Sequence, residues 1–358
     1  MRVLKPLLVI LAALLLAGAL ARTVFGVQVG EAVFRAAVNK QAGRNALADA
    51  PDGLTVVLVG TGSPVPDKGR MGPMTVVSAG GHVFIIDAGA GTGRRFGELG
   101  LPWGQVEAAF LTHFHSDHID GLGEVMLQHW AAGGADQPLP VYGPKGVELV
   151  VEGFNEAYAL DAAYRIAHHG VQVVPLSGSG AQAFPFDSTQ GAVRVYDKDG
   201  LTVTAVPVDH HPVDPAVGYR FDYKGRSVTL SGDTAKSQAL QDLARDTDLL
   251  VHEALNTEMV AGIGQRLTDI GDPRLAKIMH DIPSYHTTPV EAAELAKAAG
   301  AKMLVFSHLV PAVPSRLLYP MFLKGTKKAY EGPIILGEDG MAFELPAGSD
   351  KIVRKRLD

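Results

Sequence analysis

The stretch HFHSDHIDG, residues 113–121, gathers side chains that can bind metal ions. It holds three of the chain's 13 histidines together with two aspartates. The chain has no cysteine, which excludes disulfides, thiolate zinc sites and cysteine nucleophiles. Any metal must therefore be held by histidine and carboxylate side chains, and this stretch supplies both.

The spacing inside this stretch predicts two sets of metal ligands. If the chain leaves a strand in extended form, His113 and His115 point to the same side, because side chains alternate along a strand. The turn that follows moves Asp117 and His118 towards a second position. Two metal ions about 3.5–4 Å apart, bridged by one carboxylate, form a hydrolytic centre. Asp233, in the tight turn SGDT, is the natural bridge.

Several strand-like segments end on residues of the same kinds. Short apolar, β-branched runs occupy residues 54–60, 108–113, 201–210, 227–233, 248–254 and 302–308, with helical segments between several of them. The potential ligands at or just after their ends are His113, His115, His210, Asp233, Glu253 and His308. In α/β proteins, sites form where the carboxyl ends of strands open into loops. We therefore expect these side chains to meet in space.

The motifs occur in an order that resembles a known family. GTGSPVP, HFHSDHIDGL, VDHHPVDPAVGYRF, SGDT, HEAL, YHTTPVEAAELAKAAG and FSHLVP follow one another between about residues 54 and 345. This series resembles the metallo-β-lactamase-fold hydrolases, most closely their ribonuclease Z and arylsulfatase-like branch. The resemblance implies an α/β fold, a four-layer αβ/βα sandwich of the metallo-β-lactamase type, with an N-terminal apolar helix added here.

The resemblance also implies a role for each matching residue. One metal ion would be bound by His113, His115 and His210, a second by Asp117, His118 and His308, and Asp233 would bridge them. His210 is preferred over its neighbour His211 because it ends a strand, although the sequence leaves this choice open. Glu253 and His286 match a Glu–His pair beside the metals of ribonuclease Z-like enzymes. Asp87 is expected to brace the metal loop.

The chemistry implied is hydrolysis by a hydroxide that bridges two metal ions. His286, oriented by Glu253, would assist the leaving group; the alternative is that the pair only holds the loops in place. Two divalent ions are the expected cofactors. Zinc is preferred because histidine-rich sites suit it, with manganese and iron as alternatives.

The N-terminus predicts export or attachment to a membrane. Arg2 and Lys5 precede fifteen apolar residues, Leu7 to Ala21, and Ala19-Leu20-Ala21 offers a small-x-small cleavage pattern. Cleavage and anchoring both stay open. The predicted organisation is a signal or anchor over residues 1–22, a linker over 23–53, a hydrolase domain over 54–346 and a charged tail over 347–358. The protein is expected in the periplasm or facing outside the cytoplasm.

The substrate is the least determined feature. A net charge of −6, the export-like N-terminus and the lack of a basic arm favour a small-molecule ester: a phosphodiester, aryl sulfate, lactone or β-lactam. They argue against nucleic acid as a partner without excluding it. An aromatic segment, residues 130–195, is predicted to cover the pocket, with Phe154 and Tyr158 as candidate substrate contacts.

Other functions are kept as alternatives. The first is a ribonuclease Z-like endoribonuclease that processes tRNA 3′ ends. The second is a mono-iron sulfur dioxygenase on the same fold, which would hold one iron in place of two metal ions. The predicted partners are a small molecule and, through the N-terminus, a membrane; a homodimer is one alternative for the oligomeric state.

Overall fold

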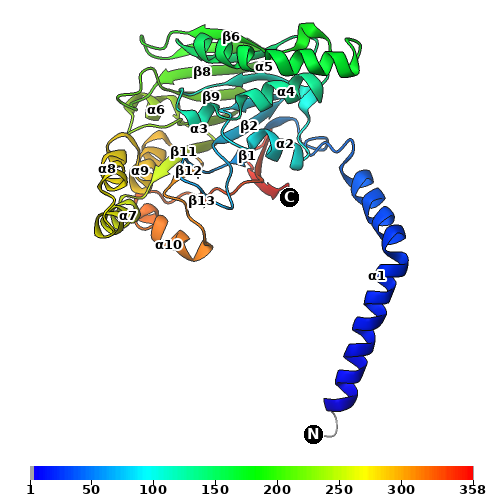
Figure 1. The fold of residues 1–358 in the computed structure, drawn as a ribbon. Coiled ribbons are helices and arrows are strands. Elements are labelled where there is room, and N and C mark those ends of the chain that lie inside the picture. Colours follow the sequence, from blue (N-terminus) through cyan, green and yellow to red (C-terminus); the bar gives the residue numbers. More distant parts are fainter. Residues whose placement is uncertain (1–3, 358) are drawn as a thin grey trace. The chain divides into compact units, whose positions relative to one another are not determined.

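The computed structural model describes residues 4–357, which divide into two compact units at the boundary between Asn45 and Ala46. The first unit is mainly helix α1, Leu4–Gln41 (Figure 1). This helix passes over the predicted boundary between anchor and linker, because EAVFRAAVNKQ is rich in residues that favour helix. The first three residues of the predicted signal segment lie outside the described residues.

No single helix within residues 4–357 is long and apolar enough to cross a membrane. Only the bent pair Leu7–Leu20 and Arg22–Gln41, with 62° between its two parts, meets that criterion jointly.

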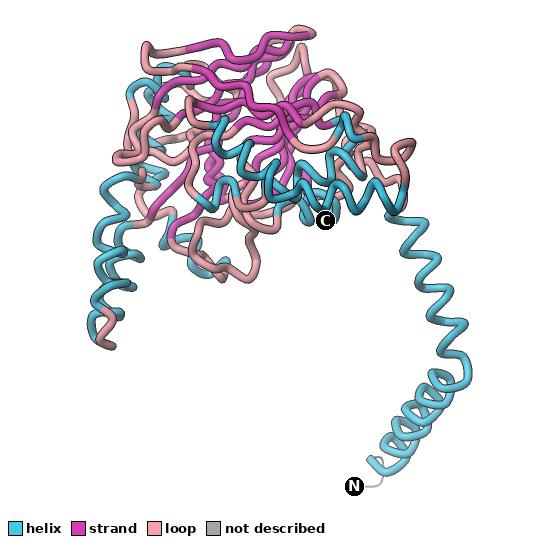
Figure 2. Tube along the Cα trace, turned by 45° about the horizontal axis from the view of Figure 1, so that its top comes forward, coloured by secondary structure: helices cyan, strands magenta, loops and turns pink. Residues whose placement is uncertain are grey.

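The second unit contains two sheets, whose strands lie together with helices along their sides (Figure 2). The first sheet has eight strands in the order β15-β14-β1-β2-β3-β4-β5-β6. Its strands are β1 Gly53–Gly60, β2 Met74–Ala79, β3 His82–Ile86, β4 Val106–Phe110, β5 Leu139–Pro144, β6 Ala181–Phe186, β14 Met341–Pro346 and β15 Val353–Arg356. Strands β3 to β6 are parallel, whereas β15, β14, β1, β2 and β3 pair antiparallel with their neighbours in that order.

The second sheet has seven strands in the order β13-β12-β11-β10-β9-β8-β7. They are β7 Val193–Lys198, β8 Leu201–Pro207, β9 Val217–Tyr223, β10 Arg226–Leu230, β11 Leu249–Leu255, β12 Met303–Val310 and β13 Ile334–Leu336. Strands β10 to β13 are parallel, and β8 runs in the same direction because two antiparallel pairings separate it from β10. The carboxyl ends of β8, β10, β11 and β12 therefore share one edge.

Helices cover the outer face of each sheet, which gives the four-layer αβ/βα sandwich expected from the resemblance. The helices of this unit are α2 Thr92–Glu98, α3 Ser116–Ile119, α4 Leu122–Ala131, α5 Val147–His169, α6 Gln238–Leu243, α7 Thr257–Asp269, α8 Pro273–Asp281, α9 Pro289–Ala299, α10 Tyr319–Phe322 and α11 Thr326–Ala329. Short 3₁₀ turns lie at η1 Trp103–Gln105, η2 Leu176–Gly178, η3 Ile282–Tyr285 and η4 Arg316–Leu318.

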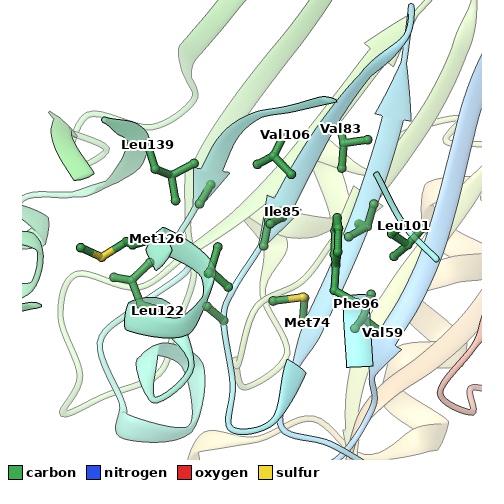
Figure 3. Close-up of a cluster of buried hydrophobic side chains, with 14 of the residues drawn as sticks. Val59, Met74, Val83, Ile85, Phe96, Leu101, Val106, Leu122, Met126 and Leu139 are labelled. Atoms are coloured by element: carbon green, nitrogen blue, oxygen red, sulfur yellow. The ribbon is translucent and has the colours of Figure 1, made fainter. Parts of the chain in front are cut away.

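The alternation of side chains along each strand builds three apolar layers. In β1, Val57 and Val59 face α2 and α4, whereas Leu58 faces the second sheet. Figure 3 shows the layer between the first sheet and its helices, where Val59 and Phe96 lie close to Met74. Both faces of the central strands are buried, as expected for sheets covered on both sides.

Two segments that the sequence predicted to be a pocket cover and a charged tail contribute strands to the sheets. Residues 130–195 supply β5, β6, the start of β7 and the helix α5, so they continue both sheets and cover the first one. The charged tail over 347–358 contains β15, which pairs antiparallel with β14. In both cases backbone pairing with distant strands decides the outcome, and composition alone does not reveal it.

Candidate metal centre

Strand ends and short loops bring the predicted ligands together. His113 and His115 follow β4, and Asp117 and His118 lie in α3. The others come from the shared edge of the second sheet: His210 after β8, Asp233 after β10 and His308 in β12. The ligand atoms of these residues form two groups, and within each group all ligand atoms lie within 4.8 Å of one another.

The first ligand group consists of His113, His115 and His210. The Nδ1 atom of His115 lies 3.1 Å from Nε2 of His113 and 3.3 Å from Nε2 of His210. Oδ2 of Asp233 lies 4.0 Å from both of those Nε2 atoms. His210 is buried and faces the group, whereas His211 is exposed.

The second ligand group consists of Asp117, His118 and His308. Oδ2 of Asp117 lies 3.6 Å from Nε2 of His118 and 3.2 Å from Nε2 of His308. Oδ2 of Asp233 is 3.4 Å from the first of these nitrogens and 3.2 Å from the second. Asp233 therefore lies between the two ligand groups, as the bridging role would require.

The outer nitrogen of three histidines is occupied by a neighbour, which leaves the inner nitrogen aimed at the site. Nδ1 of His118 lies 2.8 Å from Oδ2 of Asp87, and Nδ1 of His210 lies 2.9 Å from the carbonyl oxygen of Tyr285. Nδ1 of His113 lies 3.1 Å from Oγ1 of Thr112. Such contacts fix the ring orientation and the tautomer of metal-binding histidines.

Asp87, which contacts Nδ1 of His118, has an uncommon left-handed backbone conformation. It has φ of 59° and its carboxylate also accepts hydrogen bonds from the backbone N–H and the hydroxyl of Thr112. A left-handed residue other than glycine is uncommon and is often found at functional sites. Asp87 therefore contacts the loop that follows β4 at two residues, Thr112 and His118, which fits its expected bracing role.

Some buried polar atoms of the ligand residues have no hydrogen-bond partner within the protein. Nε2 of His118 and Oδ1 of Asp233 are buried and have no hydrogen-bond partner. Burial opposes a charge on His118, yet the carboxylates of Asp233 and Asp87 outweigh it and hold its pKa well above the usual value. Burial opposes a charge on Asp233 too, but His308 and His118 hold its pKa well below the usual value. Such a donor set favours a bound cation, so histidines and carboxylates of this arrangement fit divalent metal ions.

Glu253 and His286 form the expected pair beside the ligand groups. Glu253 lies in β11, and its Oε1 is 3.0 Å from Nδ1 of His286. The same oxygen accepts hydrogen bonds from the backbone N–H groups of Thr287 and Thr234. Burial lowers the pKa of His286, but the Glu253 carboxylate outweighs it and raises the pKa to about 9. Below that pKa the imidazole of His286 is protonated at both nitrogens in the metal-free protein, and Glu253 contacts only its Nδ1.

His308 reaches the site through an irregularity in its strand. Ser307 pairs with Glu253 and Leu309 with Ala254, so His308 is the extra residue of a β-bulge between β11 and β12. Its φ is 45°. A bulge turns a side chain out of the regular alternation, and here it turns His308 towards Asp117 and Asp233.

The proposed substrate contacts do not join this site. Phe154 packs against the apolar layer between the first sheet and its helices. Tyr158 packs against Gly123 of α4, where a Cβ atom would lie 2.2 Å from its ring. Both residues belong to α5, which covers the first sheet, so packing accounts for their positions.

Three contributors to the site had no recognisable signal in the sequence. Thr112 and Tyr285 hold histidines, the latter through its carbonyl oxygen, and Thr234 holds Glu253 through its N–H. Backbone groups give no residue-type signal. A threonine or tyrosine next to a ligand is a hint only after the ligand has been identified.

Comparison with known proteins places the chain among metallohydrolases. Residues 82–309 match the model of the β-lactamase superfamily domain. A Ribonuclease Z from Mycobacterium bovis (strain BCG / Pasteur 1173P2) is 38% identical over 262 residues, which cover 73% of this chain and 87% of the relative. A Ribonuclease Z from Mycobacterium avium (strain 104) is 39% identical over 263 residues, 73% of this chain and 87% of that protein.

Solved structures agree on the fold. Human tRNase Z, short form, has a TM-score of 0.57 and 22% sequence identity, and the match covers 82% of this chain and 99% of that one. The metallo-β-lactamase fold protein YhfI from Bacillus subtilis has a TM-score of 0.57 and 17% identity, with coverage of 82% and 100%.

These comparisons correct two of the predictions. The small-molecule ester substrate is contradicted, because relatives that share 38% identity over most of their length are ribonucleases. The predicted partners, a small molecule and a membrane, are contradicted on the same ground, and so is the expectation that argued against nucleic acid. Location outside the cytoplasm stays a prediction.

Proposed function

Because this chain belongs to the β-lactamase superfamily and is a metal-dependent hydrolase, we propose that it is an endoribonuclease of the ribonuclease Z type. Its substrate would be the 3′ extension of a tRNA precursor, and the bond cleaved would be an RNA phosphodiester. The observation that carries the proposal is the position of Asp233, whose Oδ2 lies 3.2–4.0 Å from the Nε2 atoms of four histidines in a chain that is 38% identical to ribonuclease Z.

The two ligand groups would each hold one divalent metal ion, with Asp233 shared between them. Zinc is the first choice, because three of the four histidines that surround Asp233 are oriented through Nδ1 and present Nε2. Divalent ions bound there would lower the pKa of water and draw negative charge away from the phosphoryl oxygens.

The residues of the chain account for the rest of the step. A water oxygen forms a bond to phosphorus and releases a proton to the solvent, and the bond from phosphorus to one ribose oxygen breaks. That ribose oxygen takes the proton held at Nε2 of His286, and Glu253 stabilises the protonated imidazole through Nδ1. The buried carboxylates of Asp117 and Asp233 contribute negative charge to the site, which would attract divalent cations.

The proposal is tested with the full chain, loaded with zinc, and a tRNA precursor transcript that carries a 3′ extension. We expect cleavage of the RNA at one position near the 3′ end, two metal ions per chain, and no cleavage by Asp233→Ala. The matched control is Asp197→Ala, an exposed carboxylate on β7, which should cleave as the unaltered chain does.

Two results would overturn it. Zinc-loaded protein that binds two ions but leaves the RNA intact would remove the ribonuclease assignment while keeping the metal centre. A single iron per chain with no RNA cleavage would instead favour the sulfur dioxygenase alternative.

A further inference from the structure

The bulge that carries His308 is held from both sides by strands that are remote in sequence. Before the bulge, the carbonyl oxygen of Phe306 accepts a hydrogen bond from N–H of Gly337 at 2.8 Å. After it, the N–H of Leu309 donates to the carbonyl oxygen of Thr61 at 3.1 Å. Thr61 follows β1 of the first sheet and Gly337 follows β13 of the second, so the bulge lies between two separate anchors.

A buried arginine connects the two anchors. Nη1 of Arg70 donates to Oγ1 of Thr61, and the same nitrogen donates to the carbonyl oxygen of Gly337 at 2.6 Å. Its other nitrogens lie near Tyr319 and Asp67, at 3.3 Å from the hydroxyl and 3.8 Å from the carboxylate. The guanidinium therefore fixes the distance between the anchors on either side of His308.

A buried carboxylate completes the connection. Oδ1 of Asp339 accepts hydrogen bonds from the backbone N–H of Thr61 at 2.9 Å and from its hydroxyl at 2.7 Å. Oδ2 of Asp339 accepts from N–H of Met71 at 2.7 Å. The Thr61 hydroxyl thus donates its one hydrogen to Asp339 and accepts from Arg70, so it links the carboxylate to the guanidinium.

The burial of these three groups argues against a surface ion pair. The exposed fractions are 0% for Thr61, 9% for Arg70 and 5% for Asp339. Thr61, Arg70 and Asp339 hydrogen-bond to one another or to the backbone on both sides of the bulge, and another arrangement of the chain would leave their buried polar groups without these partners. The residue in an unfavourable backbone conformation next to this network is His308, with φ of 45°.

We infer that Arg70, Thr61 and Asp339 are positioning residues for the second ligand group, since they hold the bulge that directs His308 at Asp117 and Asp233. This inference rests on the proposed function, because it assigns a purpose to the network only if His308 binds a metal ion. Loss of the network should weaken the metal held by the second ligand group and leave the metal of the first group unchanged.

The test uses Arg70→Met in the full chain, with Arg226→Met as the matched control. Arg226 is also buried, donates to the carboxylate of Asp248 at 3.0 Å, and donates to the main-chain oxygens of Pro346 and Lys351. It lies at the start of β10, whereas Asp233 follows the other end of that strand. Zinc affinity is measured for each bound ion by competition with a chromogenic chelator.

We expect one of the two zinc ions to bind about 10- to 100-fold more weakly in Arg70→Met, the range found when groups behind metal ligands are removed. Both ions should bind normally in Arg226→Met, even if that variant unfolds at a lower temperature. Raised zinc concentrations should restore RNA cleavage in Arg70→Met. In a His308→Ala background, the added change Arg70→Met should not weaken zinc binding further.

Arg70→Lys serves as the second variant if Arg70→Met does not fold. Lysine keeps a positive charge, but its side chain is shorter and its one nitrogen replaces the three guanidinium nitrogens that face Thr61 and Gly337, Tyr319, and Asp67. The same selective loss is therefore expected. Equal zinc affinities in the unaltered chain and either Arg70 variant would overturn the inference, as would an equal loss in Arg226→Met. Failure of the unaltered chain to bind two ions would instead overturn the proposed function.

Discussion

The loop after β4 and the bulge in β12 both deliver histidines to Asp233, but they are built in different ways. The loop places four candidate ligands within six residues, by extended backbone followed by the short helix α3. The bulge places His308 alone, in a left-handed conformation, between anchors from β1 and β13. The positions of the loop ligands follow from local spacing in the sequence, whereas the position of His308 depends on contacts between remote strands.

The largest expected loss of activity comes from removing one ligand from the loop after β4 or the one from the bulge in β12. His113→Ala and His308→Ala should each lower kcat/KM for RNA cleavage by at least about a thousandfold, because hydrolysis at a two-metal centre needs both ions. Steady-state cleavage and metal content per chain measure this. His169→Ala, an exposed histidine at the end of α5, is the control. Retention of a tenth of the activity in His308→Ala would show that the bulge is dispensable.

The next effect concerns the proton on His286. His286→Ala should lower kcat about 10²- to 10⁴-fold, the usual contribution of a general acid, with metal content unchanged. Because Glu253 raises the pKa of His286 to about 9, the proton is present below that pH and activity should fall as the pH rises through it.

Glu253→Gln refines this prediction. Without the carboxylate the attraction for the proton is lost, so the alkaline fall in kcat should move to lower pH, towards the ordinary histidine value of about 6.5. The measurement is the pH profile of kcat in both proteins. Identical alkaline limbs would mean that His286 is not the group that donates the proton.

The smallest effect compares the backbone at the two positions in the metal-free protein. At His308, with φ of 45°, glycine should be more stable than alanine by about 1 kcal/mol, because only alanine keeps the left-handed strain. At His113, which has no positive φ, alanine should be more stable than glycine by about 0.5–1 kcal/mol. Urea unfolding measures the free energies of unfolding of the four variants. If the same residue, glycine or alanine, were the more stable at both positions, the proposed difference between the two backbones would be wrong.

The sequence predicted the parts of the site that depend on residue type and local spacing. His113, His115, Asp117 and His118 could be recognised because alternation along a strand and the next turn determine their directions. Asp233 and His308 could be recognised because they follow or end strands of the second sheet. Glu253 and His286 are 33 residues apart, and only the resemblance to a known family connected them.

The rest depended on information that the sequence does not display. Asp339 lies 278 residues from Thr61, and no periodicity links a lone aspartate in a turn to a threonine after a strand. Overall charge misdirected the choice of substrate, because a net charge of −6 describes the whole chain and not the surface that RNA would contact. The aromatic segment at 130–195 suggested a cover, although its residues pair and pack within the sandwich.

The strand β15 has a consequence for how the protein behaves at high concentration. It pairs with β14, whose residues are largely buried, and it presents exposed Arg354, Lys355 and Arg356 at the outer edge of the first sheet. Unpaired strand edges invite other chains to add to the sheet, and positive charge discourages them. We therefore expect the C-terminal residues to hinder intermolecular β-pairing at this edge, and a chain shortened to Pro346 to expose β14 to self-association.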